Sequence, residues 1–133
     1  MERKDANQLS ALSLAFLGDS VFTLFIRDKL VRERDGKSGA LHLLANRYVC
    51  AKAQAEMMEK LDGLLSEEER AVAKRCRNAH NTSKAKNAGL ADYKRATALE
   101  GLFGFLQLTE QKARLEELMN KCVEIIDEGD KNE

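Results

Sequence analysis

The stretch LAFLGDSVF, residues 14–22, indicates how the first part of the chain folds. Apolar side chains recur at helical spacing before and after Gly18 and Asp19, so helix is predicted on both sides of this pair. Two separate helices or one kinked helix fit the pattern, and in the kinked helix Asp19 would cap the second part. The apolar positions that define the pattern are Leu9, Leu12, Phe16, Val21, Phe22, Phe25 and Ile26.

The composition predicts a single all-α domain over residues 1–133. Of the 133 residues, 44% are hydrophobic, which suits one compact core. The chain contains no proline and is rich in residues that favour helices. The folded core is expected to span about residues 7–126, followed by an acidic tail.

Further helices are predicted from capping signals and apolar periodicity. Ser66 and Glu69 have the spacing of a capping box, in which both side chains satisfy free amides at a helix start. Two apolar helices are expected around residues 99–106 and 115–126. Ser38 is predicted to cap a helix whose inward-facing side chains are Leu41, Leu44, Tyr48, Val49 and Met57.

The sequence favours a cytoplasmic protein that has no membrane partner. The first ten residues, MERKDANQLS, are polar, and no apolar run is long enough to span a bilayer. Cys50, Cys76 and Cys122 are odd in number and contain no CxxC pair, so reduced thiols are expected.

Two carboxylates lie within apolar stretches, Asp19 in LAFLGDSVF and Glu100 in ALEGLFGFL, residues 98–106. A buried carboxylate needs a partner, and a divalent cation such as Mg²⁺ is one candidate that could activate water for attack on a phosphodiester. A helix cap at Asp19 and a solvated or ion-paired Glu100 are the alternatives. Gly101 and Gly104 indicate close helix packing or the approach of a ligand.

Basic side chains are concentrated between residues 74 and 97, although the formal net charge of the chain is zero. Within this segment seven Lys or Arg residues accompany one acidic residue, Asp92. Residues 80–89, HNTSKAKNAG, have the composition of an exposed loop. Such a cluster can bind the phosphates of an RNA duplex, and the alternative is a solvated loop with cations placed favourably at helix ends.

Several stretches resemble the ribonuclease III family. LAFLGDSVF resembles its signature, in which an aspartate after leucine and glycine enters a helix, and ALEGLFGFL resembles its second motif. NRYVCAKAQA, residues 46–55, and KRCRNAHNTSKAKNAGLADYKRAT, residues 74–97, resemble blocks of the Mini-ribonuclease III branch. The resemblance covers about residues 7–126 with the motifs in the family's order.

This resemblance implies a ribonuclease III-like helical endonuclease domain that pairs as a homodimer through its signature helices. The implied activity is metal-dependent cleavage of double-stranded RNA that leaves 5′-phosphate and 3′-hydroxyl ends. Carried over by position, Asp19 and Glu100 are the catalytic residues and the ligands of Mg²⁺, for which Mn²⁺ can substitute.

The implied substrate is the precursor of 23S ribosomal RNA in the large subunit, with a large-subunit ribosomal protein as a candidate partner that presents it. No separate double-stranded RNA-binding domain is expected after the catalytic unit. Contacts with RNA are therefore predicted within this domain, at Arg47, Lys52, Arg75, Arg77, Asn78, Lys84, Lys86, Lys94 and Arg95.

The sequence also departs from the family pattern. Longer ribonuclease III chains have further carboxylates where this chain has Leu12, Ala15 and Thr97, which leaves fewer protein ligands for a metal. Cys76 and Ala85 stand where glycine and proline are expected in the RNA-binding loop region. Two other functions stay open, a catalytically silent RNA-binding or ribosome-assembly module and a plain helical interaction protein.

Overall fold

The computed structural model describes residues 1–79 and 89–131, and these residues form helices without any strand, which confirms the predicted all-α class. In chain order the elements are α1 (Arg3–Ala6), α2 (Ala11–Glu33), α3 (Ser38–Val49), α4 (Ala51–Leu61), the 3-10 helix η1 (Asp62–Leu64), α5 (Glu67–Arg77), α6 (Leu90–Leu108) and α7 (Lys112–Lys131).

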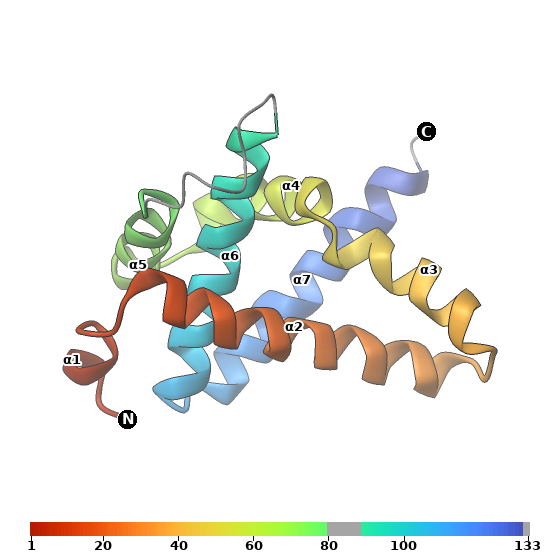
Figure 1. Ribbon diagram of the computed structural model, residues 1–133, viewed down its shortest axis with the longest axis horizontal. Coiled ribbons are helices and arrows are strands. Elements are labelled where there is room, and N and C mark those ends of the chain that lie inside the picture. Colours follow the sequence, from red (N-terminus) through yellow and green to blue (C-terminus); the bar gives the residue numbers. More distant parts are fainter. Residues whose placement is uncertain (80–88, 132–133) are drawn as a thin grey trace.

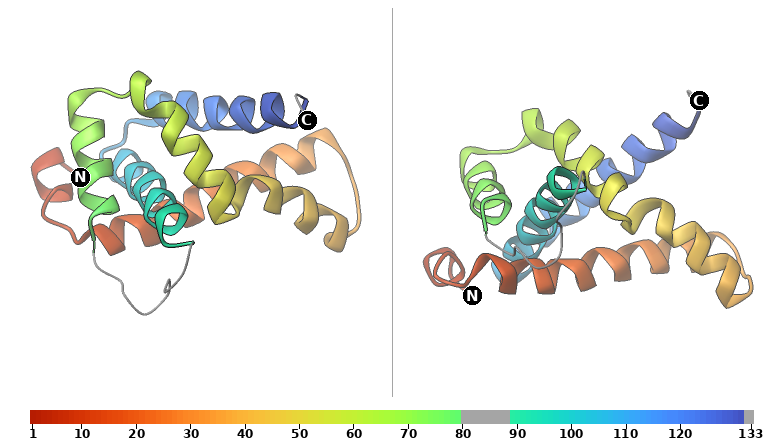
Figure 2. Two further views of the ribbon diagram at one scale, coloured as in Figure 1. Left: turned by 90° about the horizontal axis from the view of Figure 1, so that it is seen from above. Right: turned by 45° about the horizontal axis from the view of Figure 1, so that its top comes forward.

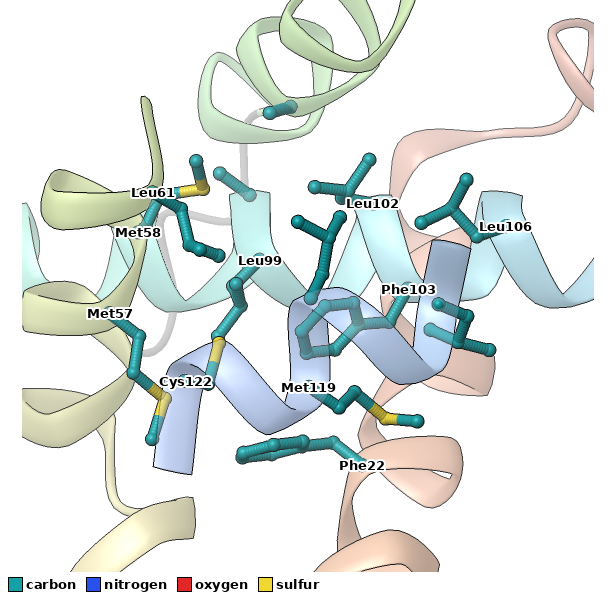
Figure 3. Close-up of a cluster of buried hydrophobic side chains, with 14 of the residues drawn as sticks. Phe22, Met57, Met58, Leu61, Leu99, Leu102, Phe103, Leu106, Met119 and Cys122 are labelled. Atoms are coloured by element: carbon teal, nitrogen blue, oxygen red, sulfur yellow. The ribbon is translucent and has the colours of Figure 1, made fainter. Parts of the chain in front are cut away.

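Helix α6 is the centre of the molecule. The long helix α2 crosses it on one side, α4 and α5 cover other sides, and α7 packs along its C-terminal half (Figure 1, Figure 2). The apolar residues of α6 are buried because neighbouring helices surround it, and its Leu99, Leu102, Phe103 and Leu106 are fully buried. Figure 3 shows these side chains meeting Phe22 of α2, Met57 of α4 and Cys122 of α7.

Helix α2 is continuous from Ala11 to Glu33, so the predicted interruption at Gly18 and Asp19 is wrong. Its N-cap is Ser10, whose hydroxyl accepts a hydrogen bond from the Ser13 amide at 3.1 Å. Asp19 lies in the middle of the helix and therefore caps nothing.

The segment predicted as one helix after Ser38 is two helices. Cys50 has an extended backbone, with φ −71° and ψ 155°, and separates α3 from α4. Lys37 occupies the N-cap position of α3 and Ser38 is the first helical residue, so the predicted Ser38 cap is also wrong.

The later helices agree with the sequence. Ser66 and Glu69 form the predicted capping box, since the Glu69 amide donates to the Ser66 hydroxyl at 3.1 Å and the Ser66 amide donates to the Glu69 carboxylate at 2.9 Å. The apolar segments predicted around 99–106 and 115–126 lie within α6 and α7.

Both ends of the core extend further than the sequence indicated. Ala6 in α1 is fully buried, and the Met1 amino group donates to the Leu108 carbonyl at 2.9 Å. Helix α7 continues past residue 126 to Lys131, and Asp127 accepts a hydrogen bond from the Tyr48 hydroxyl at 2.7 Å. Among the described residues, no helix combines the length and apolarity needed to cross a membrane.

Candidate functional site

Asp19 and Glu100 are brought together where α2 crosses α6. The crossing is so close that a Cβ added to Gly18 would lie 1.6 Å from the Glu100 carbonyl oxygen. A Cβ added to Gly104 would lie 2.0 Å from the Leu14 carbonyl oxygen. Glycine is therefore required on both helices, because any side chain would push the two backbones apart.

The two carboxyl groups at this crossing interact directly. Asp19 is exposed and Glu100 is half-buried. Burial, a hydrogen bond with Asp19 and the negative charge of Asp19 together raise the pKa of Glu100 to about 8. Two carboxyl groups this close share a proton or a cation, since both cannot be negatively charged without a large electrostatic cost.

The other positions around Glu100 are occupied by packing. Gly101 faces α5, where an added Cβ would lie 2.2 Å from the Cys76 sulfur. Gly101 and Gly104 therefore serve close helix packing, one of the two alternatives that the sequence left open. Thr97 is buried one turn before Glu100, and its hydroxyl donates to the Tyr93 carbonyl at 2.9 Å.

The Asp19–Glu100 pair fits a divalent cation. Carboxylate oxygens are hard ligands, and a cation between them would relieve the repulsion that raises the pKa of Glu100. No group of three or more His, Cys, Asp or Glu side chains suited to a metal occurs in residues 1–79 and 89–131. Two protein ligands are enough for Mg²⁺, which usually keeps several of its waters.

The predicted RNA-binding residues are dispersed over several helices. Lys52, Arg77, Asn78 and Lys94 are exposed, and Arg95 is half-buried, on α4, the end of α5 and the start of α6. Arg77 and Arg95 line one groove together with Lys74, which was noted in the basic segment but not among the expected RNA ligands. Lys84 and Lys86 lie outside the described residues.

Two other predicted RNA ligands are engaged inside the protein. Arg47 forms ion pairs with Asp130 and Asp127 of α7. Arg75 donates one hydrogen bond to the Leu9 carbonyl at 2.8 Å, and its second terminal nitrogen is buried. These contacts stabilise the fold and make both guanidinium groups less accessible to RNA.

Phe16 is a surface feature that the sequence pattern concealed. The buried stripe of α2 runs through Leu14, Gly18, Phe22, Ile26 and Leu30 at intervals of four residues. Phe16 lies two residues away from that stripe and is 81% exposed, although its apolar character contributed to the helical pattern. The four-residue stripe itself was the available signal, because it places Phe16 on the other side of the helix.

Comparison with known proteins identifies the family. The model of the Ribonuclease III domain matches residues 12–111. The chain is 45% identical over 132 residues to the Mini-ribonuclease 3 of Enterococcus faecalis, covering 98% of each chain. The chain belongs to the Mini-ribonuclease III branch of the ribonuclease III family.

Other relatives agree with this assignment. The Mini-ribonuclease 3 of Brevibacillus brevis is 43% identical, with 93% of this chain and 92% of that protein covered. A crystal structure of a Fusobacterium nucleatum protein superposes with a TM-score of 0.79 at 30% identity, covering 90% of this chain and 96% of the other. The predicted family and the ribonuclease III-like fold are confirmed.

Membership of this family also confirms the prediction of an endoribonuclease. The ribonuclease III domain acts on double-stranded RNA, and enzymes that contain it depend on a divalent metal. These findings argue against the plain helical interaction protein.

Proposed function

We propose that Asp19 and Glu100 form the catalytic pair of this endoribonuclease and that they hold Mg²⁺, which Mn²⁺ can replace. One observation carries the proposal, the direct interaction of the two carboxyl groups at the glycine crossing of α2 and α6. This crossing fixes both side chains on rigid helices, which is the support that a catalytic site requires.

The two carboxylates have different surroundings and would act differently. Half-buried Glu100 is the stronger proton acceptor, because its pKa is raised to about 8. Exposed Asp19 would face the RNA side of the site. When bound, the cation supplies an activated water and neutralises charge on the phosphate, so that hydrolysis leaves a 5′-phosphate and a 3′-hydroxyl.

Cleavage of a labelled RNA duplex, with its single strand as control, tests this proposal. Asp19→Asn and Glu100→Gln are expected to lower the rate at saturating Mg²⁺ by about a thousandfold or more, because each removes a metal ligand. Asp35→Asn and Glu116→Gln are matched controls, since they remove exposed carboxylates that have no ion pair among the described residues. Calorimetry with Mn²⁺ should show binding that both site variants lose. Retained cleavage in either folded site variant would contradict the proposal, and RNA binding without any cleavage would favour the silent RNA-binding module.

We also propose that the chain acts as a homodimer paired through α2. Several large apolar side chains of this helix are exposed, which is typical of a protein interface. They are Leu12 (41%), Phe16 (81%), Leu24 (70%) and Val31 (62%). Because Phe16 is three residues from Asp19, pairing there would place the interface beside the candidate site.

Sedimentation of Phe16→Asp tests the homodimer. The variant is expected to remain folded but to sediment as a monomer, because the interface would have to bury a charge. Leu64→Asp is the matched control, as Leu64 is 51% exposed but lies in η1. Equal sedimentation of the two variants would contradict pairing through α2.

The proposed substrate is precursor 23S ribosomal RNA, with a large-subunit ribosomal protein presenting it. The predicted RNA ligands Lys52, Arg77, Asn78, Lys94 and Arg95 lie on exposed or half-buried positions that could approach a duplex, and we also retain Lys84 and Lys86 as proposed ligands. Cleavage of naked precursor RNA and of precursor ribosomal particles should be compared at equal RNA concentration. Faster cleavage of the particles, at the same sites, is expected if a ribosomal protein presents the RNA.

A further inference from the structure

A groove of about 420 Å³ lies between α4, α5 and α6, separate from the carboxylate pair. Neither Asp19 nor Glu100 lines it. Its floor includes the apolar side chains of Met58, Ala73 and Ala98, which are buried. These side chains offer no acceptor to the charged groups at the rim.

The rim of this groove has an excess of unpaired positive charge. Lys74 and Arg77 of α5 and Arg95 of α6 line it, and none has an ion-pair partner within residues 1–79 and 89–131. A fourth cation, Arg70, is already engaged, because it lies 3.7 Å from the Asp62 carboxylate and donates to the carbonyls of Asp62 and Leu65.

Only one carboxylate of the groove opposes these three cations. Glu59 lines it, is exposed and has no ion pair among the described residues. The arrangement differs from Arg47, whose charge is neutralised by Asp130 and Asp127. Three like charges that converge without a partner favour an anionic ligand from outside the protein.

We propose that Lys74, Arg77 and Arg95 bind a backbone phosphate of double-stranded RNA, away from the phosphate that is cleaved. This inference rests on the proposed function and extends it. Arg95 and Glu100 are on the same helix, about 7.5 Å apart along its axis, so RNA held at Arg95 is held in a fixed relation to the catalytic pair. Contacts of this kind position the duplex without reading its sequence.

Fluorescence anisotropy with a labelled RNA duplex in EDTA tests the groove without cleavage. The variant Lys74→Gln/Arg77→Gln/Arg95→Gln is expected to bind roughly 10- to 100-fold more weakly near 100 mM salt, and its log–log salt slope should fall by about 3. The loss should be the same for duplexes of different sequence. A matched control, Lys112→Gln/Lys121→Gln/Lys131→Gln, removes three cations from α7. Equal affinity and salt slope in the two triple variants would overturn the proposal.

Glu59→Gln provides an independent test that does not depend on losing function. Removing this opposing charge should strengthen binding about two- to fivefold at low salt, with little effect at high salt. A purely structural role for the groove predicts no gain. Unchanged affinity in Glu59→Gln at every salt concentration would count against a phosphate in this groove. Because binding is measured in EDTA, failure of the groove leaves the result for Asp19 and Glu100 unaffected, and the reverse also holds.

Discussion

Glu69 and Glu100 are both carboxylates in the packed interior, but their surroundings are opposite. Glu69 is only 4% exposed and accepts two hydrogen bonds from Arg114, at 2.8 and 2.9 Å, and one from the Ser66 amide. Glu100 has another acid, Asp19, as its partner. A buried carboxylate that the fold neutralises is structural, whereas one that it leaves beside a second carboxylate is prepared for a ligand from outside.

The pKa values record the same difference. Hydrogen bonds from the Arg114 guanidinium, and then from the Ser66 amide, hold the pKa of Glu69 below its usual value. Burial and Asp19 raise the pKa of Glu100 to about 8. The fold therefore gains stability from the ionised form of Glu69 and loses stability from the ionised form of Glu100.

The largest expected effect comes from Gly18→Ala, which removes the geometry on which the comparison depends. Its Cβ would lie 1.6 Å from the Glu100 carbonyl oxygen, so α2 and α6 must separate. We expect the free energy of unfolding in urea to fall by more than about 3 kcal/mol, together with loss of cleavage. Gly39→Ala is the control, because nothing lies within 4 Å of its Cβ and the substitution suits helix α3. A stable Gly18→Ala variant would show that the crossing is looser than described.

Glu69→Gln should have the next largest effect. It removes the ionised partner of Arg114, whose side chain is 30% exposed, and weakens the capping box of α5. We expect a loss of about 2–3 kcal/mol in urea unfolding without a change in metal binding. Glu67→Gln, in the same first turn but exposed, should change stability little. Loss of Mn²⁺ binding in Glu69→Gln would mean that the two carboxylates are not separate in function.

The sequence predicted the Glu69 corner only in part. The capping box was predicted because Ser66 and Glu69 are three residues apart and their interaction is local. The ion pair with Arg114 spans 45 residues, and no local pattern encodes it. Arg47 was mistaken for a free cation for the same reason, since its partner Asp130 is 83 residues away.

The Asp19–Glu100 site came from family resemblance more than from local pattern. Gly18 was interpreted as a helix interruption, because the reason for glycine there is a second helix that begins at Leu90. Apolar periodicity predicted α6 and α7 well, as both bury a long stripe against neighbours. It could not show which apolar side chains of α2, such as Phe16, remain exposed.

A pH series measures the difference between the two carboxylates directly. With a raised pKa, Glu100 contributes most stability below 4.5 and progressively less as the pH rises to about 8. Glu69, with a lowered pKa, contributes above 4.5 and loses its contribution in acid as the pH falls through its folded-state pKa. In EDTA, urea unfolding of Glu100→Gln should lack the decline between pH 4.5 and 8, and Glu69→Gln should lack the acid-side loss. Added Mg²⁺ should stabilise the unsubstituted chain most near pH 8, and a slope that Glu100→Gln leaves intact would assign the decline to other groups.

The smallest effects should separate cations engaged by the fold from cations left free. Arg47 is paired on a partly exposed surface, so Arg47→Gln should cost less than about 1 kcal/mol in urea unfolding and leave RNA affinity in EDTA unchanged. Arg95→Gln removes an unpaired cation, so it should leave stability unchanged and weaken RNA binding about fivefold. The opposite result, with RNA affinity lost in Arg47→Gln and kept in Arg95→Gln, would mean that RNA breaks the ion pairs with α7. Pairing within the protein would then no longer distinguish structural from functional charges, and the contrast drawn between Glu69 and Glu100 would hold for those two carboxylates alone.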